Sequence, residues 1–163
     1  MAIIILSHFN APEMNLTAYP LKSDATFMAF TFISKGPKGT IYKIINYSKM
    51  HLEGLYNIAF GDKDKNTGGI NDTSISNNAD IEIVLATVVR SIYIFTDHYP
   101  KAYVYATGST KTRTRLYRIW ITKYLNEIKR DFQLFGLKDE VIEHFIVNEP
   151  YDAFIITRKK LPL

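Results

Sequence analysis

Two strand-like runs joined by a turn constrain the fold of this chain most strongly. Residues Phe27–Ser34 (FMAFTFIS) and Thr40–Tyr47 (TIYKIINY) are rich in the aromatic and β-branched side chains that favour strands. Between them lies Gly36–Gly39 (GPKG), a glycine- and proline-rich segment that is typical of a turn. The pattern therefore predicts a β-hairpin, and the run Leu55–Phe60 (LYNIAF) predicts a third strand beside it.

The pattern of apolar residues after residue 78 predicts a helix. Apolar residues recur at helical spacing up to about Asp97, with Ile83 and Ile94 on the opposite side, so this helix is either buried on two sides or part of an oligomer contact. A strand over Ala102–Ala106 and a second helix over Thr110–Arg130 follow. That helix is expected to turn Leu116, Ile119, Trp120, Tyr124 and Ile128 inward, and to be followed by a turn at Gly136, a short helix or loop over Lys138–His144 and a last strand over Ala153–Thr157.

This order of elements predicts an α+β fold. We expect an antiparallel three-stranded meander followed by helix–strand–helix–strand, with two main helices packed on one mixed sheet. The same order leaves a ribonuclease-H-like α/β topology as the alternative. Residues 1–13 are expected to form an N-terminal extension, and residues 14–163 a single domain, a size that suffices for a packed core.

Composition narrows the chemistry of the chain. It has no cysteine, which excludes disulfides, thiolate metal sites and a cysteine nucleophile. The four histidines have no partner at metal-ligand spacing, so we expect neither a metal site nor a cofactor. The first residues lack the basic start and cleavage pattern of a secretory signal, which favours a cytoplasmic protein without a membrane partner.

Positive charge is concentrated in one segment. Residues 101–130 contain eight Lys or Arg and one acid, a net charge of +7, whereas the whole chain carries +4 and the remainder therefore −3. A basic block on a nearly neutral body is typical of proteins that bind phosphates, although a basic helix face can also be simply solvated.

Four of these cations lie in the segment ATGSTKTRTRLYR (Ala106–Arg118), which joins a predicted strand to a predicted helix. The first turn of a helix presents backbone N–H groups and the positive end of the dipole, which together attract anions. We take the anion-binding candidates to be Gly108, Ser109, Thr110, Arg113, Arg115 and Arg118. In the alternative interpretation the segment only caps the helix, and Arg113, on its apolar side, pairs with Asp62, Asp72 or Asp80. The spacing is not that of a P-loop.

Further polar residues could line such a site. They are Asp62, Asp72, Asn77, Asn78 and Asp80, and Asn77–Asp80 equally fits the start of the first helix. The loop from Gly61 to Asp72 begins like a calcium loop, but Thr67 stands where glycine is required and Thr73 where glutamate is required. We therefore expect a polar surface loop there.

Three motifs carry a resemblance to a known family: NxAFGD at residues 57–62, SNNxD at 76–80 and GSTxxRTRLY at 108–117. Over roughly Leu16 to Lys160, the chain resembles an uncharacterised family of small bacterial proteins, found mainly in Bacteroidota. It places these polar motifs together but implies no activity, so no catalytic residue can be assigned from it.

Three functions fit these observations. The best supported is a phosphate- or nucleic-acid-binding module that uses residues 108–118. The second is a protein-interaction component, such as one half of a toxin–antitoxin-like pair or a homodimer. The third is a metal-dependent enzyme on nucleotides or nucleic acid, which the absence of acids on the first predicted strand argues against.

Overall fold

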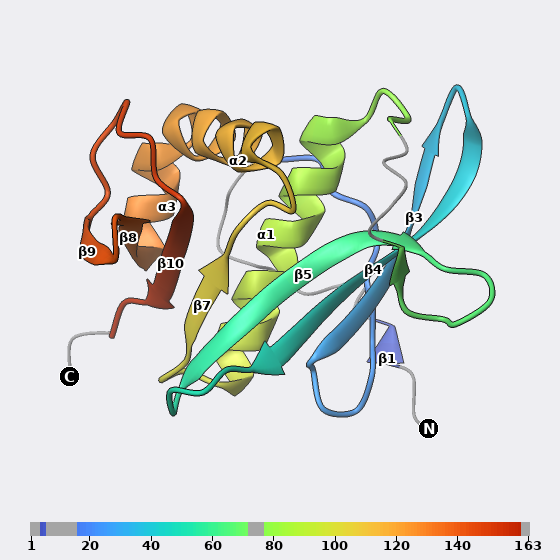
Figure 1. Ribbon diagram of the computed structural model, residues 1–163. Helices are drawn as coiled ribbons and strands as arrows, with labels where there is room; N and C mark the ends of the chain where they lie inside the picture. Colours follow the sequence, from blue (N-terminus) through green and yellow to red (C-terminus); the bar gives the residue numbers. More distant parts are fainter. Residues whose placement is uncertain (1–3, 6–15, 72–76, 161–163) are drawn as a thin grey trace. The chain divides into compact units, whose positions relative to one another are not determined.

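A computed structural model describes residues 4–5, 16–71 and 77–160 of the chain (Figure 1). The chain falls into two compact units. The first contains Met1–Ser48 and Ile58–Tyr99, and the second contains Lys49–Asn57 and Pro100–Leu163.

The first unit is built on an antiparallel hairpin. Its strands are β1 (Ile4–Ile5), β2 (Lys22–Ser23), β3 (Ala29–Gly36), β4 (Gly39–Lys49), the part of β5 (Leu55–Lys63) from Ile58 onward, and β6 (Ile70–Asn71). They lie in the order β1-β2-β3-β4-β5, with β6 paired to β5. The β3–β4 register runs from Gly36 opposite Gly39 to Ala29 opposite Asn46, which confirms the predicted hairpin.

Helix α1 (Ile81–His98) supplies much of the buried surface of this unit. The ring of Tyr47 stacks on Phe95 with 4.0 Å between centroids, and the Tyr47 hydroxyl lies 2.8 Å from the Ser91 hydroxyl. Ile94 is also fully buried, although it is on the side opposite the main apolar face. This side of the helix was expected either to be buried within the chain or to form an oligomer contact, and Ile94 is buried within the chain.

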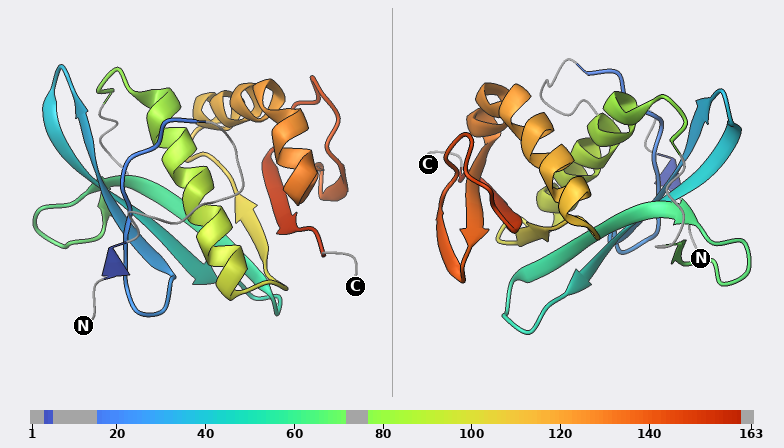
Figure 2. Two further views of the ribbon diagram at one scale, coloured as in Figure 1. Left: turned by 180° about the vertical axis from the view of Figure 1, so that it is seen from behind. Right: turned by 45° about the horizontal axis from the view of Figure 1, so that its top comes forward.

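The second unit has a sheet with two helices on one side (Figure 2). Residues Leu55–Asn57 of β5 run parallel to β7 (Tyr103–Ala106). Antiparallel pairing then joins β7 to β10 (Ala153–Arg158), β10 to β8 (Phe132–Lys138) and β8 to β9 (Val141–His144), so the order is β5-β7-β10-β8-β9. The helices are α2 (Lys111–Lys123) and α3 (Leu125–Asp131).

Several local predictions for this unit were wrong. The single helix over residues 110–130 is interrupted at Tyr124, whose ψ of 23° departs from helical geometry. Leu116 and Ile119 are 37% and 52% exposed and do not face inward. Residues 141–144 form strand β9 in place of a helix or loop.

Gly136 was expected in a turn but lies inside β8. A Cβ atom at this position would meet the Tyr151 ring at 2.4 Å. The strand therefore accepts glycine because an aromatic ring from another segment occupies the space of its side chain.

The α+β prediction is confirmed. The β5–β7 pair is parallel, whereas the pairs β1–β2, β2–β3, β3–β4, β5–β6, β7–β10, β8–β10 and β8–β9 are antiparallel. An α/β sheet would be mainly parallel. The N-terminal extension and the single-domain boundary stay predictions. None of the described helices is long and apolar enough to cross a membrane.

Candidate functional site

The turn between β7 and α2 is held by its own hydroxyl groups. Thr110 is the N-cap residue, and its side chain accepts a hydrogen bond of 3.2 Å from the Arg113 backbone N–H. The Thr114 hydroxyl accepts from the Gly108 N–H at 3.1 Å and donates to the Thr110 carbonyl at 3.2 Å. A Cβ on Gly108 would lie 2.5 Å from the Thr114 nitrogen, so only glycine lets the turn approach the helix this closely.

This capping leaves several donors facing solvent. The backbone N–H groups of Ser109, Thr110, Lys111 and Thr112 have no hydrogen-bond acceptor among the described residues, and all four residues are exposed. These groups form the positive end of the α2 dipole. The turn therefore offers a set of fixed donors at one place.

A groove of about 570 Å³ opens beside these donors. Lys111, Arg115 and Arg118 line it together with residues 107–110, and Tyr151 and Asp152 contribute further lining. The Arg118 guanidinium donates to the Glu149 carbonyl at 3.2 Å. Three cations from consecutive turns of α2 thus border the unpaired N–H groups.

The part of the groove formed by residues 150–152 is fixed by specific contacts. The Tyr151 hydroxyl donates to Glu143 Oε1 at 2.7 Å and accepts from the Ile146 N–H at 3.0 Å. Loss of solvation, followed by the bond to Glu143, raises the pKa of Tyr151. The Thr107 hydroxyl donates to the Asp152 carbonyl at 2.7 Å and joins this segment to the turn.

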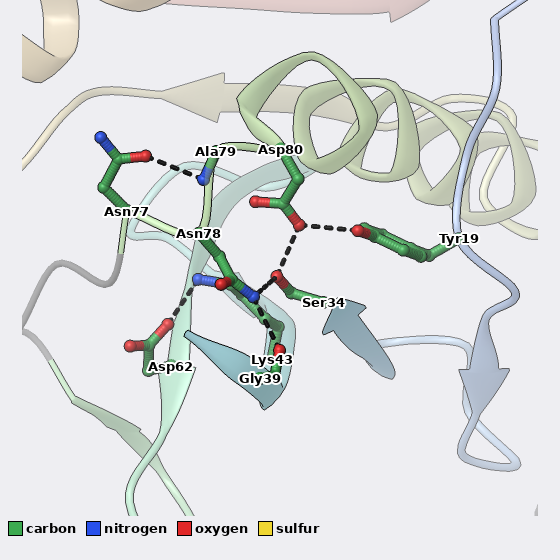
Figure 3. Close-up of polar contacts among 9 residues, drawn as sticks. All are labelled: Tyr19, Ser34, Gly39, Lys43, Asp62, Asn77, Asn78, Ala79 and Asp80. Atoms are coloured by element: carbon green, nitrogen blue, oxygen red, sulfur yellow. Dashed lines mark hydrogen bonds and ion pairs between the residues drawn. The ribbon is translucent and has the colours of Figure 1, made fainter. Parts of the chain in front are cut away.

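A second polar cluster lies in the first unit, where α1 begins (Figure 3). The Asn78 side chain is buried; its amide donates to Ser34 Oγ at 3.1 Å and to the Gly39 carbonyl at 3.0 Å. Its oxygen accepts from the Lys38 N–H at 2.8 Å. Asn78 therefore fastens the tip of the β3–β4 hairpin to the start of α1.

The neighbouring acids have partners within the same unit. Asp80 Oδ2 accepts from the Tyr19 hydroxyl at 2.7 Å and from the Ser34 hydroxyl at 2.5 Å, and its side chain does not cap α1. Asp62 forms an ion pair of 2.5 Å with Lys43, and both side chains are largely buried. These carboxylates serve contacts that hold the first unit together.

The chain matches a family model over residues 15–159. It belongs to DUF6934, a family of unknown function. Comparison with curated proteins and with solved structures gives no match. The DUF6934 match includes the strand–turn–helix groove and the Asn78 cluster.

Five of the six anion-binding candidates of this DUF6934 chain line the groove. They are Gly108, Ser109, Thr110, Arg115 and Arg118. The sixth, Arg113, is not among the lining residues, because its guanidinium bends back and donates to Ser109 Oγ at 2.7 Å. Burial raises the pKa of the nearby Tyr117, and the Arg113 charge partly opposes that rise. Lys111 was omitted from the predicted set, although its place as the first residue of α2 was the available signal.

The additional site-lining candidates have separate outcomes. Asn77 accepts from the Ala79 N–H at 3.1 Å, an ordinary turn contact. Asp72 lies outside the described residues. In the polar loop that starts like a calcium site, the carboxylate of Asp64 accepts from the Asn66 and Thr67 N–H groups, and these bonds lower its pKa. Across the described part of the chain, no three His, Asp or Glu side chains are grouped to hold a metal ion.

Proposed function

We propose that this DUF6934 protein binds phosphate groups, carried by a nucleic acid or another phosphorylated ligand, in the groove at the start of α2. One observation carries the proposal. The side chains of Lys111, Arg115 and Arg118 border the same groove as the unpaired N–H groups at positions 109–112. The two kinds of donor that bind phosphates most readily therefore occur together.

Each group contributes in its own way. The N–H groups are fixed by the capped turn, so they lose little conformational freedom when an anion binds. Arg115 and Arg118 present planar guanidinium groups that match two phosphate oxygens at once, whereas Lys111 acts as a point charge. A tetrahedral, doubly charged anion fits this arrangement better than a carboxylate.

The electrostatic balance favours an anion. Asp152 is the one acid among the lining residues, so three cations and one acid give the groove a net charge of +2 at neutral pH. The segment Lys101–Arg130 around it carries +7. Binding of a polyanion should consequently weaken as salt rises, because counterions are released when phosphates are neutralised.

Inorganic pyrophosphate provides the direct test. It should shift the amide NMR signals of Ser109 to Thr112, and the shifts should be lost in the double variant Lys111→Ala/Arg115→Ala. The matched control is Lys63→Ala/Lys65→Ala, which removes two exposed lysines of the first unit. Unmoved amide signals in the wild type, or equal shifts in both variants, would rule out the proposal.

A labelled single-stranded oligonucleotide tests the nucleic-acid form of the ligand. The logarithm of the affinity should fall linearly with the logarithm of salt concentration, and the Lys111→Ala/Arg115→Ala variant should reduce that slope by about 1.4, at roughly 0.7 per lost phosphate contact. The Lys63→Ala/Lys65→Ala control should retain the wild-type slope.

A second candidate function rests on β9. This strand ends the sheet order of the second unit, and Val141, Ile142, Ile146 and Val147 on and after it are between 42% and 61% exposed. An exposed apolar edge strand is a common place for another chain to bind. The Ile142→Lys variant should lower the oligomeric state or remove a co-purifying partner, as measured by light scattering, if β9 has this role.

A further inference from the structure

At the start of β7, the two faces of the second unit's sheet carry different side chains. Side chains alternate between faces along a strand, and directly paired residues share a face. Val104, Ile156 and Leu134 are aligned across β7, β10 and β8, and Val104 and Leu134 are buried. The next aligned set, Tyr103, Thr157 and Gln133, points to the opposite face, where the central Thr157 is buried and donates to the Ala102 carbonyl at 3.0 Å.

Tyr103 stands out on that opposite face. Its side chain is 46% exposed although it lies in a strand with a neighbour on each side, and Gln133 in the same aligned set is also exposed. A tyrosine in this position contributes little to the core. Its accessible ring is a surface on which a planar ligand can stack.

A second groove, of about 650 Å³, opens at this aligned set. Tyr103 and Gln133 line it together with four cations: Lys101, Arg158, Lys159 and Lys160. No acid is among the described residues that line it.

Two of these four cations make local contacts within the unit. The Arg158 guanidinium lies over the Phe132 ring, 5.2 Å from its centroid, and the Lys159 ammonium group donates to the Lys129 carbonyl. Lys101 and Lys160 are exposed lysines in the same lining.

We propose that this second groove binds single-stranded nucleic acid, with a base stacked on Tyr103 and adjacent phosphates held by Lys101 and Lys160. The inference goes beyond the proposed function, because it assigns a ligand class to a second groove that shares no lining residue with the first. Single strands expose base faces that a duplex hides, and proteins bind them by combining aromatic side chains with a cationic groove.

The Tyr103 ring and the four cations together fit a single-stranded nucleic acid better than a simpler ligand. A free phosphate would gain nothing from Tyr103, and an apolar peptide would gain nothing from four cations. The groove also lies apart from the first one. Tyr103 begins β7 and Thr107 follows its end, a separation of roughly 13 Å for four residues at about 3.3 Å each. Each groove can therefore be altered separately.

The test is fluorescence anisotropy of the full chain with a short labelled single strand, as RNA and as DNA, and with the duplex of the same sequence. Tyr103→Ala should weaken binding of the single strand roughly 5- to 150-fold, the range measured for removal of one base–aromatic stack. Tyr103→Trp should restore it, since tryptophan also stacks. Binding of the duplex should not change between the wild type and Tyr103→Ala.

Tyr42→Ala is the matched control. Tyr42 is a strand tyrosine of the first unit with 60% exposure, so its removal costs similar apolar surface without touching the groove. It should leave the affinity unchanged. Circular dichroism should show that all three variants are folded.

Each result has a defined meaning. Equal affinity of Tyr103→Ala and the wild type, or no binding of single strands by the wild type, overturns this inference and leaves the pyrophosphate result at Ser109–Thr112 unaffected. Failure of Tyr103→Trp to restore binding overturns the stacking role. The proposed function fails separately, when pyrophosphate does not shift those amides.

Discussion

Replacing Asn78 by alanine tests the polar cluster that fastens the β3–β4 hairpin to α1. The Asn78 side chain is 2% exposed and makes three hydrogen bonds, to the Ser34 hydroxyl, the Gly39 carbonyl and the Lys38 N–H. Alanine removes all three bonds and leaves a cavity where the amide was. Gly36 packs so closely on the Asn78 backbone that a Cβ there would lie 2.0 Å from the Asn78 carbonyl oxygen, which restricts how far the hairpin can move to close the cavity.

The expected loss follows from the partners that remain. A net value of about 1 kcal/mol per hydrogen bond gives about 3 kcal/mol. Lys38 and Gly39 are exposed residues whose backbone groups can bond to water, and the Ser34 hydroxyl still donates to Asp80. These replacements reduce the loss, whereas the cavity increases it, so we expect a decrease of roughly 2–3 kcal/mol in the free energy of unfolding.

Urea unfolding followed by circular dichroism measures this change, with Asn77→Ala as the control. Asn77 is exposed and makes one turn contact, so its removal should cost less than about 1 kcal/mol. The fluorescence of Trp120, the sole tryptophan, follows the second unit and shows whether the effect is confined to the first. Equal stability of the two variants would show that the buried amide does not hold the hairpin.

Three further substitutions probe other contacts. Lys43→Met removes the cation of the largely buried ion pair with Asp62 and should lower the free energy of unfolding in urea by roughly 2–4 kcal/mol. Adding Asp62→Leu should recover most of this loss, because no unpaired charge then stays buried. A double variant as unstable as the single one would contradict this. Gly108→Ala places a Cβ 2.5 Å from a helix nitrogen and should cost about 1–3 kcal/mol, with shifted amide signals in the first groove; a thermal midpoint like that of the wild type would refute the close packing. Tyr47→Phe loses the bond to Ser91, worth about 1 kcal/mol at neutral pH. Burial raises the pKa of Tyr47 above its usual 10.0, so the contribution of neutral Tyr47 to the free energy of unfolding is complete below that pH and is lost as pH rises toward the folded-state pKa. The stability advantage of the wild type over Tyr47→Phe should therefore shrink in urea titrations at alkaline pH. A constant difference would argue against a neutral Tyr47 in the core.

The β3–β4 hairpin and the start of α2 could be predicted from residues that are close together in the sequence. The turn at Gly36–Gly39 lies between two runs rich in aromatic and β-branched residues, so the hairpin could be predicted from those residues alone. The cap by Thr110 and the groove-lining positions of Arg115 and Arg118 followed from the order strand, small residues, helix.

The misses came from contacts between distant parts of the sequence. The break at Tyr124 has no glycine or proline to signal it. The place of Gly136 in a strand depends on Tyr151, fifteen positions later. Asn78 fitted a helix start, but its buried contacts are with residues about forty positions earlier, which no local pattern reveals. Arg113 was predicted to bind an anion from its place on the helix, but its side chain adopts a conformation in which it donates to Ser109 and does not line the groove.

The division of β5 has a consequence for any attempt to dissect this protein. Residues Leu55–Asn57 are paired with β7 in the second unit, while the rest of the strand, from Ile58, belongs to the first, which makes the first unit's segment Ile58–Tyr99 an insertion in the sequence of the second. A fragment that starts at Pro100 would leave one side of β7 without its strand partner, and exposed strand edges promote aggregation. A chain that joins Lys49–Asn57 to Pro100 through a linker of about a dozen residues, the length that a crossover between parallel strands needs, would allow that pairing, so it is the form in which the groove-bearing half should be isolated.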